Sequence, residues 1–270
     1  MKNNEKLINK FKDLLSNPLK NNLKMYSKLN KLVKNGVPIS TVNRFGKNLL
    51  TVAVQSDNEI LFDYALQNSK NLTKEEFIDW QDSLKCTPLY FASQTGNLKF
   101  VKKLREVNAN PNLNGLGGWS PLIKAAEIFN LEIMNELKEM GANPNQKNFL
   151  GDTAAHVAAH EASKQKNQEN NEKFISVLMS LSEMGANLSA LNGNEESVED
   201  VYLKTDIQSI LDSASKGNIN ANKMLMENLS NPTAKNLNII TENKVIDYFK
   251  DNQPKSNANG KRSPTQLEMQ

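Results

Sequence analysis

The chain has 270 residues, of which 38% are hydrophobic and 23% charged, with a formal net charge of +3. This balance is typical of a folded protein and excludes a disordered polyelectrolyte. Cys86 is the single cysteine, so an internal disulfide is excluded, and the cysteine count does not indicate an oxidising compartment. No secretory signal is visible at Met1, and no run of about 20 apolar residues predicts a transmembrane helix.

The first 35 residues carry nine lysines against two acidic residues, Glu5 and Asp13. Residues 5–16 show an apolar face, and a second helix is expected after Pro18, with most lysines on the opposite faces. These two helices predict a basic helical cap over residues 1–34. Their apolar positions are Leu7, Ile8, Phe11, Leu14 and Leu15, followed by Leu19, Leu23, Tyr26, Leu29 and Val33.

Three segments align without gaps at a period of 33 residues, beginning at Thr87, Ser120 and Thr153. They read TPLYFA, SPLIKAA and TAAHVAA, and each unit closes on a motif such as NANPN or GANPN. This pattern resembles the ankyrin repeat. The resemblance implies an all-α fold with short β-hairpin fingers: a solenoid of about four to five repeats over residues 35–212, with the helical N-terminal cap in front.

The motif residues also have local physical roles. Thr87 and Ser120 can cap the first helix of their repeats, each followed by a proline at the first helical position. Gly141, Gly185 and Asn108 stand where a second helix should end in the left-handed conformation.

Two insertions interrupt the period. The first falls near residues 70–85, where Thr73 could cap a short extra turn. The second, residues 161–172, is polar and charged, and we predict a mobile loop between the two helices of its repeat. Beyond the repeats we predict a short helical extension over 213–250 and a disordered tail over 251–270.

The sequence offers few groups for catalysis or metal binding. His156 fills the histidine position of the repeat motif, where the resemblance implies local hydrogen bonds. His160 lies one turn later, but no properly spaced ligand completes a metal site with this pair. Cys86 has no catalytic signature around it, and we expect a small surface or half-buried residue. We therefore predict no enzyme, no catalytic, cofactor-binding or metal-binding residue, and no cofactor.

The resemblance implies that the fingers and the inner helices form a concave surface that binds a partner. The variable positions of this strip are unusually apolar at its centre, which indicates an interaction site. The predicted partner-binding residues are Phe45, Leu84, Leu116, Trp119, Ile128, Phe149, Leu150 and Asp152. In the competing interpretation, Phe45, Leu84 and Leu150 share one repeat position and pack finger against finger.

These observations favour a monomeric, cytoplasmic scaffold or adaptor with a protein partner. The composition also suits an effector that an intracellular microbe secretes into a host cell. The alternative is docking of the lysine-rich cap on nucleic acid or on an anionic membrane. An enzyme of unrecognised type is the third hypothesis.

Overall fold

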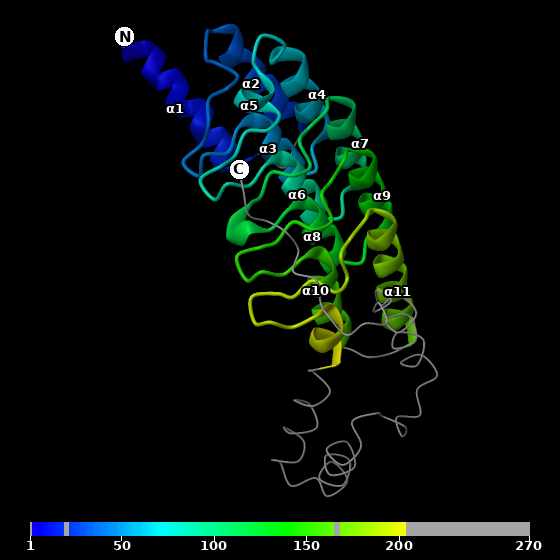
Figure 1. Ribbon diagram of the computed structural model, residues 1–270. Helices are drawn as coiled ribbons and strands as arrows, with labels where there is room; N and C mark the ends of the chain where they lie inside the picture. The colour runs from blue at the N-terminus through cyan, green and yellow to red at the C-terminus, as the bar shows by residue number, and fades with distance from the viewer. Residues whose placement is uncertain (1, 19–21, 165–167, 204–270) are drawn as a thin grey trace, which may run out of the picture.

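The computed structural model describes residues 2–18, 22–164 and 168–203 (Figure 1). The predicted extension over 213–250 and tail over 251–270 lie outside the described residues. The α-helices are α1 (Lys2–Ser16), α2 (Asn22–Lys34), α3 (Leu49–Gln55), α4 (Glu59–Asn68), α5 (Lys74–Phe77), α6 (Pro88–Gln94), α7 (Leu98–Glu106), α8 (Pro121–Glu127), α9 (Leu131–Glu139), α10 (Ala154–Lys164) and α11 (Gln168–Glu183). A short 3-10 turn, η1, spans Leu116–Gly118.

The helices stack as antiparallel pairs along one axis. In Figure 1 the inner helices α3, α6, α8 and α10 form one row, the outer helices α4, α7, α9 and α11 form a second, and loops project from the inner row. Residues 198–203 begin a further helix. The described residues thus contain four complete helix pairs and the start of another, which confirms the predicted all-α repeat solenoid.

Side-chain caps start the paired helices as the motif predicts. The Thr87 hydroxyl accepts the Tyr90 amide at 3.1 Å, and the Ser120 hydroxyl accepts the Ile123 amide at 3.2 Å. In the repeat that precedes Thr87, where the sequence reads NLLTVA in place of TPLYFA, Asn48 takes this role for α3 and accepts the Thr51 amide at 2.9 Å. Each cap satisfies a backbone donor that the helix itself leaves without a partner.

The core lies between the two helix rows. Ala92, Ala125 and Ala158 are fully buried, which lets neighbouring inner helices approach closely. Between the outer helices, the rings of Phe62 and Phe100 lie 4.9 Å apart, both fully buried. The second helices end as predicted, because Asn108, Gly141 and Gly185 have φ of 57°, 80° and 85°.

The two cap helices pack on the first repeat. Phe11 and Leu15 of α1 and Met25 and Leu29 of α2 are buried, and the amide of Asn43 donates to the Leu15 carbonyl at 3.1 Å. The prediction that Leu23 belongs to the apolar face of the second helix was wrong, since its side chain is 68% exposed. Met25 takes its place because the helical phase of α2 turns that side chain inward.

The first insertion forms the predicted extra turn. Thr73 and Glu76 make a reciprocal capping box at the start of α5, with bonds of 2.9 and 3.2 Å between each side chain and the other residue's backbone. Phe77 at the end of this turn is buried.

The prediction of a mobile loop over 161–172 was wrong for the residues that the structure describes, 161–164 and 168–172. Residues 161–164 continue α10, and residues 168–172 begin α11. Ala162 and Asn171 are buried, and the hydroxyl of Tyr202 donates to the Asn171 side chain at 3.0 Å. The charged residues pair along the helix surfaces, with Lys164 to Glu161 and Lys173 to Glu169 both at 2.6 Å.

The five fingers are turns rather than paired strands. We name them finger 1 (residues 43–47), finger 2 (82–86), finger 3 (115–119), finger 4 (148–152) and finger 5 (192–196). In each, the amide of the first residue donates to the carbonyl of the last, at 2.8 to 3.0 Å. No strand occurs in the described part of the chain, so the β-hairpin character of the fingers is not confirmed.

Candidate partner-binding surface

Four of the five fingers are held by the side chain of their first residue. In finger 1 the Asn43 Oδ1 atom accepts the amides of Phe45 and Lys47, at 2.9 and 3.0 Å. The same pair of bonds recurs in the other three, which begin with Asp82, Asn148 and Asn192. This turn leaves the two residues at its tip to point outward.

Finger 3 is built differently because its first residue is Gly115. A Cβ atom there would lie 2.7 Å from the Tyr90 ring, so an asparagine cannot occupy this position. The turn instead uses Gly117 and Gly118 with φ of 70° and 78°. Any side chain at Gly118 would meet Phe149, whose ring carbon Cδ1 lies 2.6 Å from the ideal Cβ position. Fingers 3 and 4 therefore approach backbone to backbone.

Backbone hydrogen bonds join successive fingers. Phe149 donates to the Gly117 carbonyl at 2.9 Å, and two other pairs of fingers are joined in the same way, through Ser83 to Phe45 and Gly193 to Leu150. Because these links use the backbone, they do not depend on which side chains stand at the fingertips.

Fingers 2 and 3 are linked through the thiol of Cys86. Leu116 donates its amide to the Cys86 Sγ atom at 3.4 Å, and the thiol donates to the Leu84 carbonyl at 3.6 Å. Cys86 is 2% exposed, so the expectation of a surface or half-buried residue was wrong. Burial raises the pKa of this thiol, which keeps it protonated and able to donate.

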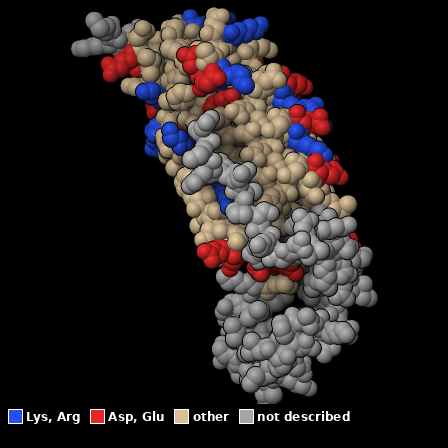
Figure 2. Space-filling model, viewed as in Figure 1, with Lys and Arg blue, Asp and Glu red and all other residues tan. Residues whose placement is uncertain are grey.

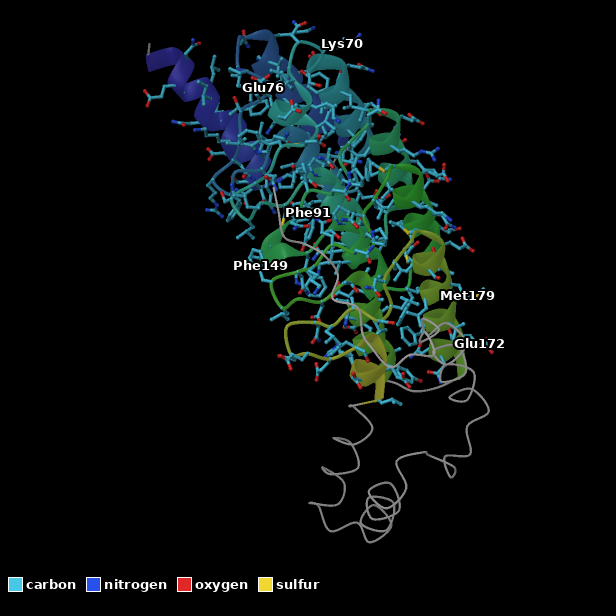
Figure 3. All side chains as sticks on the ribbon, in the orientation of Figure 1. Lys70, Glu76, Phe91, Phe149, Glu172 and Met179 are labelled. Atoms are coloured by element: carbon cyan, nitrogen blue, oxygen red, sulfur yellow. The ribbon has the colours of Figure 1, made fainter. Side chains whose placement is uncertain are left out.

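Six of the eight predicted partner-binding residues are exposed apolar side chains. Their exposed fractions run from 43% for Ile128 to 84% for Phe149, the others being Phe45, Leu84, Leu116 and Leu150. Figure 3 shows Phe149 projecting from its finger, away from the helices. We call the five fingers and the exposed ends of the inner helices the finger surface.

Trp119 and Asp152, the other two predicted residues, are half-buried. The indole of Trp119 packs against the core, and the Lys124 ammonium lies 3.9 Å from its ring centroid. Lys124 also pairs with Glu127 at 2.9 Å. Trp119 therefore has internal contacts in addition to its exposed part, because the glycine turn of finger 3 lays the ring against α8.

A hollow of about 440 Å³ lies between fingers 3 to 5 and the inner helices α8 and α10. Trp119, Leu150 and Val157 form apolar parts of its wall, and Asp152 and Glu196 contribute carboxylates. The amide of Asn192 donates to Asp152 at 2.9 Å and to Glu196 at 3.2 Å, which fixes both carboxylates side by side.

His156 has the structural role that its motif position predicts. Its Nδ1 atom accepts from the Thr153 amide at 3.3 Å, with the Thr153 hydroxyl 2.9 Å away. The Nε2 atom then donates to the Glu196 carbonyl at 3.1 Å, joining finger 5 to α10. Burial lowers the pKa of His156, so the ring is neutral at neutral pH.

His160 lies apart from these bonds. Its side chain is exposed, and its Nδ1 atom lies 3.8 Å from the Glu161 carboxylate. Across the described ranges, no group of three or more His, Cys, Asp or Glu side chains is placed to hold a metal ion.

The cap presents a second, basic surface. The lysines at positions 6, 10, 12, 24, 28, 31 and 34 are all exposed. Between α1 and α2 lies a groove of about 450 Å³, with Leu7, Leu14 and Leu32 along it and Lys10, Lys28 and Lys31 at its sides.

The fold and the finger surface define a helical-repeat solenoid built to present an extended side. A family model for three copies of the ankyrin repeat matches residues 20–115, and a model for a single repeat matches residues 117–149. The chain is an ankyrin-repeat protein. The match begins ahead of α2, so the second cap helix falls within the repeat array. Comparison with curated proteins gives no match.

Ankyrin repeats are generally protein–protein interaction modules, and ankyrin-repeat proteins are typically non-enzymatic scaffolds. Within residues 2–18, 22–164 and 168–203, no helix has the length and hydrophobicity needed to cross a bilayer.

Proposed function

We propose that this protein is a scaffold or adaptor that binds a protein partner through the finger surface, the concave side of the ankyrin array. The observation that carries the proposal is the run of six exposed apolar side chains on fingers 1 to 4 and the end of α8. Exposed large apolar residues gathered on one surface mark interaction sites.

The fingers are well suited to this role because they are already ordered. Paired hydrogen bonds from Asn43, Asp82 and Asn148 fix the turns, and backbone bonds join one finger to the next. A partner that covers Phe149 and Leu150 then buries apolar surface while little conformational entropy of the fingers is lost.

The outer helices offer a contrasting surface. Their charges pair with one another between repeats, and Figure 2 shows Lys and Arg alternating with Asp and Glu along the right edge of the molecule. The closest pairs are Lys103–Asp63 at 2.7 Å, Lys103–Glu59 at 2.8 Å, Arg105–Glu136 at 3.0 Å and Lys138–Glu183 at 3.0 Å. A surface whose charges are already matched has less to offer a partner.

The test is capture of partners from lysate by the full chain, with nuclease added to remove nucleic acid. Phe149→Ala combined with Leu150→Ala should abolish capture of a protein that the wild type retains. Met179→Ala is the matched control, because Met179 is 52% exposed on α11 and Figure 3 shows it on the opposite side from Phe149. Equal capture by the finger variant and the wild type would overturn the proposal.

The lysine-rich cap supports a second candidate function, docking on nucleic acid or an anionic membrane. The exposed lysines of α1 and α2 and the groove between these helices favour it. Replacing Lys10, Lys28 and Lys31 with glutamine should then weaken retention by single-stranded DNA or by vesicles containing phosphatidylserine. Unchanged retention would contradict this candidate. The cytoplasmic location and the effector role stay predictions from composition.

A further inference from the structure

The finger surface carries opposite charges at its two ends. Arg44, Lys47 and Lys85 belong to fingers 1 and 2, whereas Asp152, Glu195 and Glu196 belong to fingers 4 and 5. Finger 2 also contains Asp82, but its side chain is buried and accepts the amides of Leu84 and Cys86. Finger 3 between them has no charged residue. In Figure 2 the left edge of the molecule shows blue atoms below the N-terminal helix and red atoms at its lower end.

The basic groups are positioned by uncharged partners. The Arg44 guanidinium lies 4.7 Å from the Phe45 ring centroid. The Lys47 ammonium donates to the Gln55 side chain at 2.8 Å and lies 4.9 Å from the Phe91 ring centroid. Aromatic rings and a neutral amide orient these cations but do not neutralise their charge.

The acidic end is also a hollow. The Asn192 amide, which carries no charge, donates to both Asp152 and Glu196 and holds the two carboxylates together. The Trp119 indole and Leu150 line the same hollow of about 440 Å³. Glu161 and Lys164 also line it and pair with each other at 2.6 Å. A long side chain with an apolar stem and a cationic head fits this combination, because the stem can cover the apolar wall while the head meets the carboxylates.

We propose that the finger surface recognises an extended protein segment of defined polarity. The segment carries a lysine or arginine that enters the hollow at fingers 4 and 5, apolar residues over Leu84, Leu116 and Phe149, and an acidic residue opposite Arg44 and Lys47. This assignment rests on the proposed function and adds the chemistry and the direction of the partner. Opposite charges along one surface fix the orientation of a partner as well as its rate of association.

The test uses random peptides displayed on phage, of about 16 residues, which span about 50 Å when extended. Peptides selected on the full wild-type chain should be enriched in Lys or Arg at one end, Asp or Glu at the other and apolar residues between. A synthetic peptide from the enriched set then serves as the probe for affinity measurements.

Asp152→Asn combined with Glu196→Gln removes two charges with little change in side-chain size. This variant should bind the probe about tenfold more weakly, and the loss should shrink when the probe's Lys or Arg is replaced by glutamine. The matched control is Glu132→Gln with Glu139→Gln, which makes the same change in net charge at exposed residues of α9. The control should bind the probe like the wild type.

The outcomes separate the two proposals. Selection of apolar peptides without charge enrichment, or an equal loss in the Asp152/Glu196 variant and its control, would overturn the charge assignment and leave the proposed function standing. Retention of the selected peptides by the Phe149→Ala and Leu150→Ala variant at wild-type affinity would overturn both. Melting temperatures of all variants confirm that a loss of affinity is not a loss of fold.

Discussion

Replacing Gly118 with alanine tests the close approach of fingers 3 and 4. Gly118 has φ of 78°, so any side chain there adopts the left-handed conformation at a cost of about 1–2 kcal/mol. The new Cβ atom would also lie 2.6 Å from Phe149 Cδ1 and 2.9 Å from the Phe149 amide nitrogen. Relieving such an overlap typically costs a further 1–3 kcal/mol, so the total loss is about 2–5 kcal/mol.

Gly141→Ala is the matched control, because Gly141 has φ of 80° and its Cβ would meet nothing within 4 Å. It should lose only the conformational part, about 1–2 kcal/mol. Urea denaturation of both variants gives the two free energies of unfolding, and the effect of alanine on the unfolded chain cancels between them. Equal losses would refute the close contact between Gly118 and Phe149.

Three other results are expected. First, the contribution of neutral His156 to the free energy of unfolding should be fully present above pH 6.5 and should be lost as the pH drops towards the lowered pKa of this residue, because the unfolded chain takes up a proton that the folded chain resists. Melting temperatures measured across this pH range should depend less on pH in His156→Gln, whereas His160→Gln, at an exposed residue, should behave like the wild type. Second, Trp119→Ala should reduce the free energy of unfolding, measured by urea denaturation, by about 2 kcal/mol, because the half-buried ring and its contact with Lys124 are lost. This value lies between those typical of exposed and of fully buried residues, and a loss under about 0.5 kcal/mol would contradict the packing of the ring. Third, deleting residues 1–34 should lower the melting temperature by about 6–12 °C for a loss of about 3 kcal/mol, and an unchanged melt would show that the cap is an appendage.

The repeat fold could be predicted from the sequence because the local signals agree with one another. Thr87 and Ser120 cap helices, prolines follow them, and Gly141 and Gly185 end the outer helices at the same repeat position. Each of these residues acts on the helix turn next to it, so the prediction does not depend on any long-range contact. Among the candidate site residues, the exposure of Phe149 and Leu150 at a fingertip could be predicted from their position within the 33-residue repeat.

The prediction of a mobile loop in the second insertion was wrong because composition does not show which polar residues are buried in the fold. Asn171 is buried through its bond with Tyr202, 31 residues further along the chain, and no local pattern encodes that contact. The helix-forming signal was present in the pairs Glu161–Lys164 and Glu169–Lys173, whose spacing of three or four residues supports a helix.

The packing of Trp119 and the burial of Cys86 could not be predicted for a similar reason. Both close their fingers at one repeat position, yet the glycines of finger 3 turn the indole onto α8, and Cys86 bridges two fingers through its thiol. Asparagine likewise has specific roles here, since Asn43, Asn148 and Asn192 each hold a finger turn. The available signal was an Asn or Asp five residues before the N-cap position of a repeat's first helix, which recurs in four of the five fingers but not in finger 3, where Gly115 stands.

Hydrogen–deuterium exchange in the presence of a captured partner tests the central claim most directly, because it locates the bound surface on the intact chain. Binding through the finger surface predicts slower exchange in fingers 1 to 5, with the outer helices α4, α7 and α9 unchanged. The finger residues are 43–47, 82–86, 115–119, 148–152 and 192–196. Slower exchange confined to those outer helices, or to α1 and α2 of the cap, would contradict binding through the finger surface.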